Sequence, residues 1–256
     1  MIDADMIVAC ECSGIVRDAF RRKGINAISC DLKETERPGP HIIVKSDNEL
    51  RDLLYSKKWL AAFSFPPCTR LTNAGFWYIL KYDLQHEVKK AAGFFNMVMN
   101  APAKFSLTEN PVQHGLARQY IRDYDQSVQP YNFLENASKR TCFWLKGLPP
   151  LKKTGFFPPR MVNGQALWND QLPLFDDIDM SALPRWDNQT DAGQDKKGQS
   201  KRRAADRSRT FPGIAAAMAD QWAPLMHRAI NASNDVTEYL QLPLFCDMEH
   251  TVINKL

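Results

Sequence analysis

Features that would direct a protein to a membrane, a metal or an oxidising compartment are missing from this sequence of 256 residues. No apolar run approaches the roughly 20 residues that cross a bilayer. The segment 1–5 is acidic, whereas a signal peptide begins with a basic and then an apolar region. The six cysteines form no Cys-x-x-Cys pair and no Cys/His cluster with zinc spacing. We therefore expect a reduced, cytoplasmic protein that uses no metal.

A strong charge of either sign is also lacking. The formal net charge is +4, which permits a nucleic-acid partner without requiring one. Hydrophobic residues make up 44% of the chain, enough for one full domain with a sizeable core and some appendages.

The opening of the chain lacks the glycine-rich dinucleotide fingerprint, because its first turn holds a single glycine, Gly14. The pattern nevertheless predicts a strand over 6–10, an amphipathic helix over 16–23 and a second strand over 26–30 that is closed by Asp31. A βαβ unit of this kind binds an adenosine group, with a carboxylate accepting from the ribose hydroxyls. Many small α/β domains share such an opening, so this signal is weak on its own.

A single cysteine, Cys68, follows a predicted buried strand over 60–63 and two prolines that stop the strand. Ligands bind at the carboxyl ends of strands in open α/β sheets, so the pattern indicates a nucleophile held on a stiff turn. The alternative is a strand that ends at prolines and happens to carry a cysteine.

A second polar group, Glu109, follows a predicted strand over 104–108. Further strand and helix patterns over 41–44, 47–54 and 84–99 alternate along the chain, which predicts a mostly parallel sheet with helices on both faces. Cys68 and Glu109 would then share one edge of that sheet. A thiolate that adds to C6 of a pyrimidine makes C5 nucleophilic, and a carboxylic acid protonates the ring at N3. The base must leave the duplex stack for this reaction.

Four motifs stand in the same order as in the DNA cytosine-5 methyltransferases, and the chain most closely resembles the compact phage and prophage branch of that family. The motifs are Glu11-Cys12-Ser13-Gly14, Asp31, Pro66-Pro67-Cys68 and Glu109-Asn110-Pro111. A late Phe-Pro-Gly-Ile-Ala segment fits the same branch, and the likeness runs from about residue 7 to 222. The resemblance implies a Rossmann-like fold of the S-adenosylmethionine-dependent methyltransferases, in a bacterial cell or phage-infected host.

The resemblance also implies roles for single residues. Cys68 is expected as the nucleophile and Glu109 as the ring-protonating acid. Ser13 and Gly14 are expected near the methionine part of S-adenosylmethionine, Asp31 at its ribose and Asp47 near its adenine. The expected cofactor-binding set is Glu11, Cys12, Ser13, Gly14, Asp31, Asp47 and Pro66.

The sequence departs from that family in two ways. No Gln-x-Arg-x-Arg segment follows the glutamate motif, and Lys139 and Arg140 are the nearest basic residues. The large target-recognition domain is missing or reduced to a region between about 151 and 209.

The segment 128–151 interleaves aromatic and basic residues, which either grip nucleic acid or form an irregular packed segment. The polar stretch 176–199 predicts a flexible insertion. It ends in basic residues with few acids beside them, which form a solvated face or neutralise phosphates. The expected nucleic-acid-binding set is Asn110, Lys139, Arg140, Lys201, Arg202, Arg203, Arg207 and Arg209.

A pentapeptide, Gln-Leu-Pro-Leu-Phe, occurs twice, at 171–175 (Gln171 to Phe175) and at 241–245 (Gln241 to Phe245). Apolar groups in a mobile segment often serve a partner's groove. The peptide resembles the motif by which bacterial DNA enzymes dock on the sliding clamp. The alternative is that its leucines and phenylalanines pack back onto the domain.

We expect a monomer with a catalytic core over 1–151 and a small DNA-recognition region over 152–209. A helix over 210–230 would complete the core, and a tail over 231–256 would follow. The predicted activity is methylation of C5 of cytosine in DNA. An RNA cytosine-5 methyltransferase and a non-catalytic DNA- or clamp-binding scaffold remain alternatives. A methyltransferase for exocyclic amines is disfavoured, because Phe65 precedes Pro-Pro where an Asp, Asn or Ser would accept from the amine.

Overall fold

The computed structural model describes residues 2–162, 165–166, 184–192 and 209–241. Their helices and strands follow one another along the chain in the following order: β1 (Met6–Ala9), α1 (Ile15–Arg22), β2 (Ala27–Asp31), β3 (His41–Ile43), α2 (Asp47–Leu54), β4 (Trp59–Ser64), α3 (Asn73–Lys81), α4 (Gln85–Met99), β5 (Ala103–Pro111), η1 (Ala117–Gln119), β6 (Gln126–Val128), η2 (Pro130–Phe133), β7 (Thr141–Lys146), β8 (Met161–Val162), β9 (Gln165–Ala166) and α6 (Pro212–Gln241).

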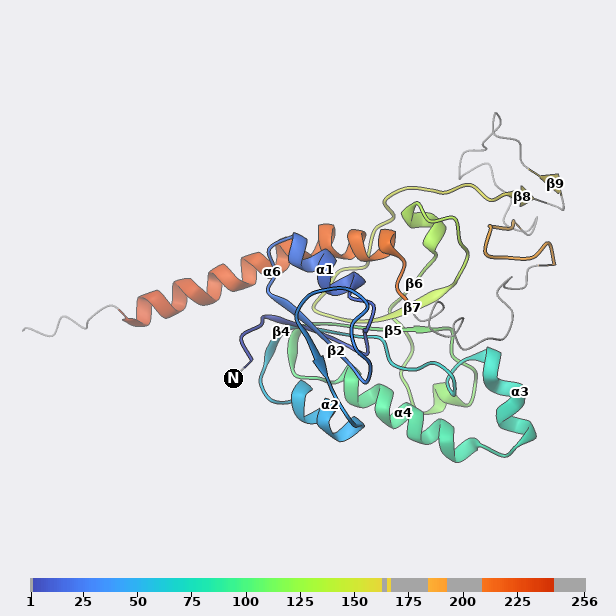
Figure 1. The fold of residues 1–256 in the computed structure, drawn as a ribbon, viewed down its shortest axis with the longest axis horizontal. Helices are drawn as coiled ribbons and strands as arrows, with labels where there is room; N and C mark the ends of the chain where they lie inside the picture. The colour runs from blue at the N-terminus through green and yellow to red at the C-terminus, as the bar shows by residue number, and fades with distance from the viewer. Residues whose placement is uncertain (1, 163–164, 167–183, 193–208, 242–256) are drawn as a thin grey trace, which may run out of the picture.

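A seven-stranded sheet with the order β3-β2-β1-β4-β5-β7-β6 forms the centre of the molecule (Figure 1). The strands β1 to β5 run parallel to one another, whereas β7 runs antiparallel to both β5 and β6. The order reverses between β1 and β4, which makes their carboxyl ends the switch point where ligands bind in open α/β sheets. The predicted α/β class, a mostly parallel Rossmann-like sheet with helices on both faces, is confirmed.

Helices cover both faces of this sheet, as the strand sequences require. In β1 the side chains of Met6 and Val8 join one core with α1 and α6, whereas those of Ile7 and Ala9 join the other core with α2 and α4. Successive side chains of a strand point to opposite faces, so an uninterrupted apolar strand needs a cover on each side. This is why the strand sequences read as continuous apolar runs.

The helix α6 begins at a tight contact that explains the Phe-Pro-Gly-Ile sequence. The Glu135 carboxylate accepts from the backbone N–H of Gly213 at 2.6 Å, which satisfies one donor of the first helical turn. A side chain at Gly213 would collide with the Phe133 carbonyl oxygen, so only glycine fits there. The helix runs to Gln241, well beyond the predicted end at residue 230.

For the aromatic segment 128–151 the structure favours the packed alternative over a grip on nucleic acid. Phe143 and Trp144 are buried in β7, so this part of the segment is a regular strand. Part of the predicted flexible insertion is packed, contrary to the expectation: Trp186 is 2% exposed, stacks on Tyr131 at 4.0 Å between ring centroids and donates to the Phe157 carbonyl oxygen. Composition alone did not predict this packing, because the burial of a ring depends on the surface that it meets in the folded chain.

Within the described ranges, no helix is both long and apolar enough to cross a bilayer. In the same ranges, no cluster of three or more His, Cys, Asp or Glu side chains has the arrangement to hold a metal ion.

Candidate active site

The loop that carries Cys68 leaves β4 at the switch point of the sheet. The N–H of Phe65 donates to the Ala9 carbonyl oxygen at 3.0 Å, so the chain stays beside β1 for one residue after the strand ends. The Cys68 carbonyl oxygen then accepts from the Leu71 N–H at 3.0 Å and from the Thr72 hydroxyl at 3.3 Å. Cys68 is half-buried and therefore accessible at the end of a fixed turn.

The segment Glu109-Asn110-Pro111 belongs to β5 itself, beyond the predicted end of that strand at 108. The side-chain amide of Asn110 donates to the Pro66 carbonyl oxygen at 2.9 Å, and Asn110 is 1% exposed. This buried hydrogen bond joins the residue after Glu109 to the residue two before Cys68. The thiol and the carboxylate therefore lie at the same edge of the sheet.

Asn110 was predicted to bind nucleic acid. The structure gives it a different position, inside the protein and against the backbone of the Cys68 loop. A direct contact with nucleic acid stays a prediction, and the contact that is seen holds the loop.

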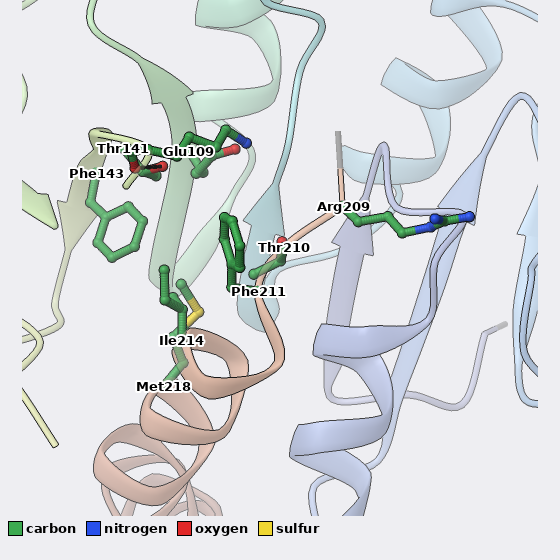
Figure 2. A pocket seen from close by; sticks show the side chains of 9 residues that line it. Glu109, Thr141, Phe143, Arg209, Thr210, Phe211, Ile214 and Met218 are labelled. Carbon is green, nitrogen blue, oxygen red and sulfur yellow. Dashed lines mark hydrogen bonds between the residues drawn. The ribbon is translucent and has the colours of Figure 1, made fainter. Parts of the chain in front are cut away.

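A small pocket surrounds Glu109 at this edge (Figure 2). Burial raises the pKa of Glu109, while the charge of Lys139 and a hydrogen bond with the Thr141 side chain pull that pKa back down. In Figure 2 the Thr141 side chain lies next to Glu109, and Phe211 and Phe143 form apolar walls. A carboxyl group with a raised pKa keeps its proton to higher pH than an exposed glutamate does.

The basic residues near the pocket have different hydrogen-bond and ion-pair partners. Lys139 lines the pocket, whereas Arg140 is exposed and donates to the Tyr124 hydroxyl at 2.9 Å. Arg209 was expected to face few acids, but its guanidinium extends away from Glu109 and pairs with both carboxylate oxygens of Glu36 at 2.8 and 2.9 Å. Four of the predicted basic residues lie outside the described residues: Lys201, Arg202, Arg203 and Arg207. The two pentapeptides also lie outside them, except for the backbone of Gln241.

The turn after β1 contains the expected cofactor residues. Cys10 and Gly14 have positive φ angles of 57° and 69°, so the chain reverses sharply between β1 and α1. One carboxylate oxygen of Glu11 accepts from the Ser13 hydroxyl and from the Val16 N–H, both at 2.9 Å. The other, Oε2, is buried and has no hydrogen-bond partner among the described residues. Burial raises the pKa of Glu11 to about 7.

Asp31 and Asp47 follow the carboxyl ends of β2 and β3, on the same side of the sheet. Asp31 is half-exposed and accepts from the Lys33 N–H at 3.0 Å, and Asp47 is the exposed first residue of α2. Burial raises the pKa of the Cys10 thiol, and the charges of Cys30, Asp31 and Asp47 raise it further. Both aspartates therefore lie close enough to the turn to act on its electrostatics.

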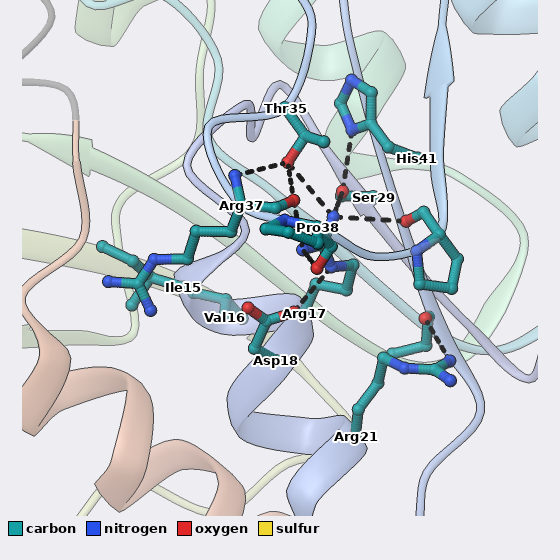
Figure 3. Close-up of polar contacts among 12 residues, drawn as sticks. Ile15, Val16, Arg17, Asp18, Arg21, Ser29, Thr35, Arg37, Pro38 and His41 are labelled. Atoms are coloured by element: carbon teal, nitrogen blue, oxygen red, sulfur yellow. Dashed lines mark hydrogen bonds and ion pairs between the residues drawn. The ribbon is translucent and has the colours of Figure 1, made fainter.

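Two residues of this region were not predicted from the sequence. The Thr141 side chain hydrogen-bonds with Glu109 across the β5–β7 pair, and Arg17 holds the loop after β2 (Figure 3). Arg17 is fully buried, and its guanidinium donates to the hydroxyls of Ser29 and Thr35 and to three backbone carbonyl oxygens of the loop after β2. The only sequence signal for it was a charged residue next to the apolar face of α1.

Arg17→Met is expected to destabilise the protein strongly, because it leaves those buried acceptors without donors. The cost should be about 3–5 kcal/mol, equivalent to a Tm lower by roughly 10 °C for a chain of this size. Thermal unfolding followed by circular dichroism measures it. Arg51→Met is the matched control, since Arg51 is 56% exposed and pairs only with its neighbour Asp52. Equal Tm values for the two variants would refute the assigned role.

No protein-family model matches the chain, and no curated protein matches it. Among solved structures, the chain is similar to a prophage-encoded E. coli protein described as a DNA modification methyltransferase, with 12% identity and a TM-score of 0.36 over 56% of this chain and 46% of that one. It is also similar to the Entamoeba histolytica methyltransferase EhMeth, with 15% identity and a TM-score of 0.38 over 64% and 59% of the two chains. The chain thus spans less than two thirds of either protein. At these identities and scores neither likeness assigns a function.

Proposed function

We propose that this protein transfers a methyl group from S-adenosylmethionine to C5 of cytosine in DNA, through a covalent bond between Cys68 and C6 of the base. The observation that carries the proposal is the buried hydrogen bond from Asn110 to the Pro66 carbonyl oxygen. It holds a thiol and a carboxyl group at one edge of the sheet, next to the switch point where a ligand binds.

Cys68 is the nucleophile in this mechanism. Its thiolate forms the Sγ–C6 bond, and the electron pair of the C5–C6 double bond moves toward C5 as the ring nitrogen N3 takes a proton. Burial raises the pKa values of Cys10, Cys12, Cys30 and Cys142 above that of an ordinary cysteine.

Glu109 holds the proton that N3 requires. Its raised pKa keeps the carboxyl group protonated to higher pH than in an exposed glutamate, and its hydrogen bond with Thr141 fixes the direction in which it points. After methyl transfer, loss of the C5 proton and of the Cys68 sulfur restores the aromatic base.

The turn after β1 fits the proposed cofactor. The unpaired buried oxygen of Glu11 is an acceptor for an ammonium group, and the sharp turn at Gly14 brings backbone close to a ligand. We propose that Asp31, the last residue of β2, accepts from the ribose hydroxyls and that Asp47, the first residue of α2, lies near the adenine. S-adenosylmethionine, when bound there, supplies the methyl group. Pro66 and Cys12 complete the predicted set.

DNA is the proposed partner, because the reaction at C6 requires a base outside the duplex stack. Lys139 in the pocket and the exposed Arg140 are candidates to contact it. The basic residues between 201 and 207 are proposed to neutralise phosphates, and the two Gln-Leu-Pro-Leu-Phe peptides to dock on a sliding clamp. A monomer suffices for this chemistry.

Trapping with 5-fluorocytosine tests the proposal. Duplex DNA that contains the analogue is incubated with the protein and S-adenosylmethionine, and the products are analysed on a denaturing gel and by intact mass. Fluorine cannot leave as a proton, so the enzyme should remain covalently attached to the DNA. Peptide mapping should place the attachment at Cys68.

A protein that binds the cofactor but forms no adduct on DNA of varied sequence would overturn the proposal. The same assay on RNA with 5-fluorocytosine separates the two remaining explanations. An adduct on RNA alone would assign an RNA methyltransferase, and no adduct on either would assign a non-catalytic scaffold.

A further inference from the structure

The helix α3, which directly follows the Cys68 loop, presents aromatic rings to solvent. Trp77 is 75% exposed, and Tyr78 and Tyr82 are 51% and 52% exposed. Side chains four positions apart are neighbours on a helix, so Trp77 lies beside Lys81, and Tyr78 lies beside Tyr82, the residue that follows α3. The rings of Tyr78 and Tyr82 are 4.5 Å apart between centroids. We call these four residues the ring face of α3.

The rings of the ring face are exposed although α3 is packed firmly against the rest of the protein. The opposite side of α3 is anchored, since Ile79 is fully buried and the Phe76 ring lies 4.7 Å from that of His114. The His114 Nδ1 atom accepts from the Ala117 N–H, so its Nε2 atom donates to the Arg70 carbonyl oxygen at 3.0 Å. The helix therefore holds its rings in fixed directions, beside the loop that carries Cys68. Figure 1 shows α3 at the edge of the molecule, beyond the start of α4.

Cations accompany these rings. The Arg70 guanidinium lies 5.5 Å from the centroid of the Tyr78 ring, and the Lys81 ammonium lies 5.3 Å from that of Tyr82. Lys89 and Lys90 are exposed on the first turns of α4, while Glu87 is paired with Arg70 at 2.6 Å. Rings that alternate with cations match a strand of unstacked bases on a phosphate backbone, because each base offers a flat face and each phosphate a negative charge.

We propose that the ring face of α3 stacks the bases next to the target once that base has left the duplex. This inference rests on the proposed function, since it takes the substrate to be DNA in which one base is displaced near Cys68. Stacking of these bases on the rings replaces the base–base stacking that is lost when the target base leaves the duplex. The cations of α3 and α4 bind the flanking phosphates.

Binding of two fluorescein-labelled duplexes tests the proposal by anisotropy. They share one sequence, and in one of them an abasic site faces a central cytosine, so that this base and its neighbours unstack easily. Trp77→Ala should weaken binding of the abasic duplex by roughly tenfold, the size expected for one lost base–ring stack. Trp77→Phe, which keeps a ring, should restore most of the affinity. Tyr55→Ala is the matched control, because Tyr55 is 46% exposed on α2 and should bind as the wild type does.

Tryptophan fluorescence gives a second readout. Trp59, Trp144, Trp186 and Trp222 are at most 2% exposed, so among the described residues Trp77 is the tryptophan that solvent and bases reach. Binding of the abasic duplex should quench the wild type more than Trp77→Phe.

Unchanged affinity in Trp77→Ala would overturn the inference. So would a wild-type dimer that Trp77→Ala converts to a monomer in analytical ultracentrifugation, because a second copy of the chain would then cover the ring face. The trapping experiment distinguishes a failure of the proposed methyl transfer from a failure of the ring-face proposal. A wild type that forms no 5-fluorocytosine adduct but binds DNA through Trp77 would refute the chemistry and keep the surface.

Discussion

Cys68→Ser is expected to abolish the covalent adduct with 5-fluorocytosine DNA and to lower methyl transfer by at least about 10⁴-fold, as loss of a catalytic nucleophile commonly does. A serine hydroxyl is almost never ionised at neutral pH, so the attack on C6 fails even though the loop geometry is kept. Transfer of radiolabelled methyl groups from S-adenosylmethionine to DNA measures the rate. Binding of DNA and of cofactor should be retained, which confines the loss to the chemical step.

Cys246→Ser is the control for that experiment, since it removes a thiol near the carboxyl end of the sequence. It should react at the rate of the wild type. Methyl transfer by Cys68→Ser at more than about a hundredth of the wild-type rate would contradict the assigned role. A loss that small would be no larger than the loss of a general acid or base, which contributes about 10²–10⁴-fold.

Glu109→Gln is expected to lower kcat by about 10²–10⁴-fold, the usual contribution of a positioned general acid. Glutamine keeps the shape of the side chain but cannot give a proton to N3. The loss should appear in kcat more than in KM, because the proton is needed in the transition state. Single-turnover methyl transfer over a range of pH measures it.

The direction in which the rate of methyl transfer changes with pH follows from the protonation of Glu109. Burial raises the pKa of Glu109 above its ordinary value, and the protonated acid is the active form. The contribution of Glu109 to the wild-type rate should therefore be lost as pH rises through its pKa, which gives the profile a falling limb. In Glu109→Gln this falling limb should be absent, while Glu34→Gln, a change at an exposed carboxylate, should keep it. A limb that persists unchanged in Glu109→Gln would assign the titration to another group.

Local patterns were sufficient for much of the fold. The apolar runs and helical periodicities before residue 111 predicted β1 to β5 with α1, α2 and α4, because strands buried on both faces and amphipathic helices leave a strong signal. The prolines after β4 predicted that Cys68 stands at a strand end, and the alternation of elements predicted the shared edge with Glu109. The signal weakened where it depended on partners: α3 was not predicted, and β7 was interpreted as an aromatic, turn-rich segment.

The sequence by itself determined the element order of the parallel half and the candidate pair Cys68 and Glu109, since each depends on residues a few positions apart. The strand order, and with it the switch point, came from the tertiary structure. Only the tertiary structure decided how these parts are held. The hydrogen bond from Asn110 to Pro66 spans 44 positions, and the ion pair from Arg209 to Glu36 spans 173. Burial of Arg17 depends on a loop about 20 residues away, and the raised pKa of Glu109 depends on the burial that its surroundings impose. Hydrogen-bond partners and desolvation come from neighbours in space, which a pattern along the chain does not specify.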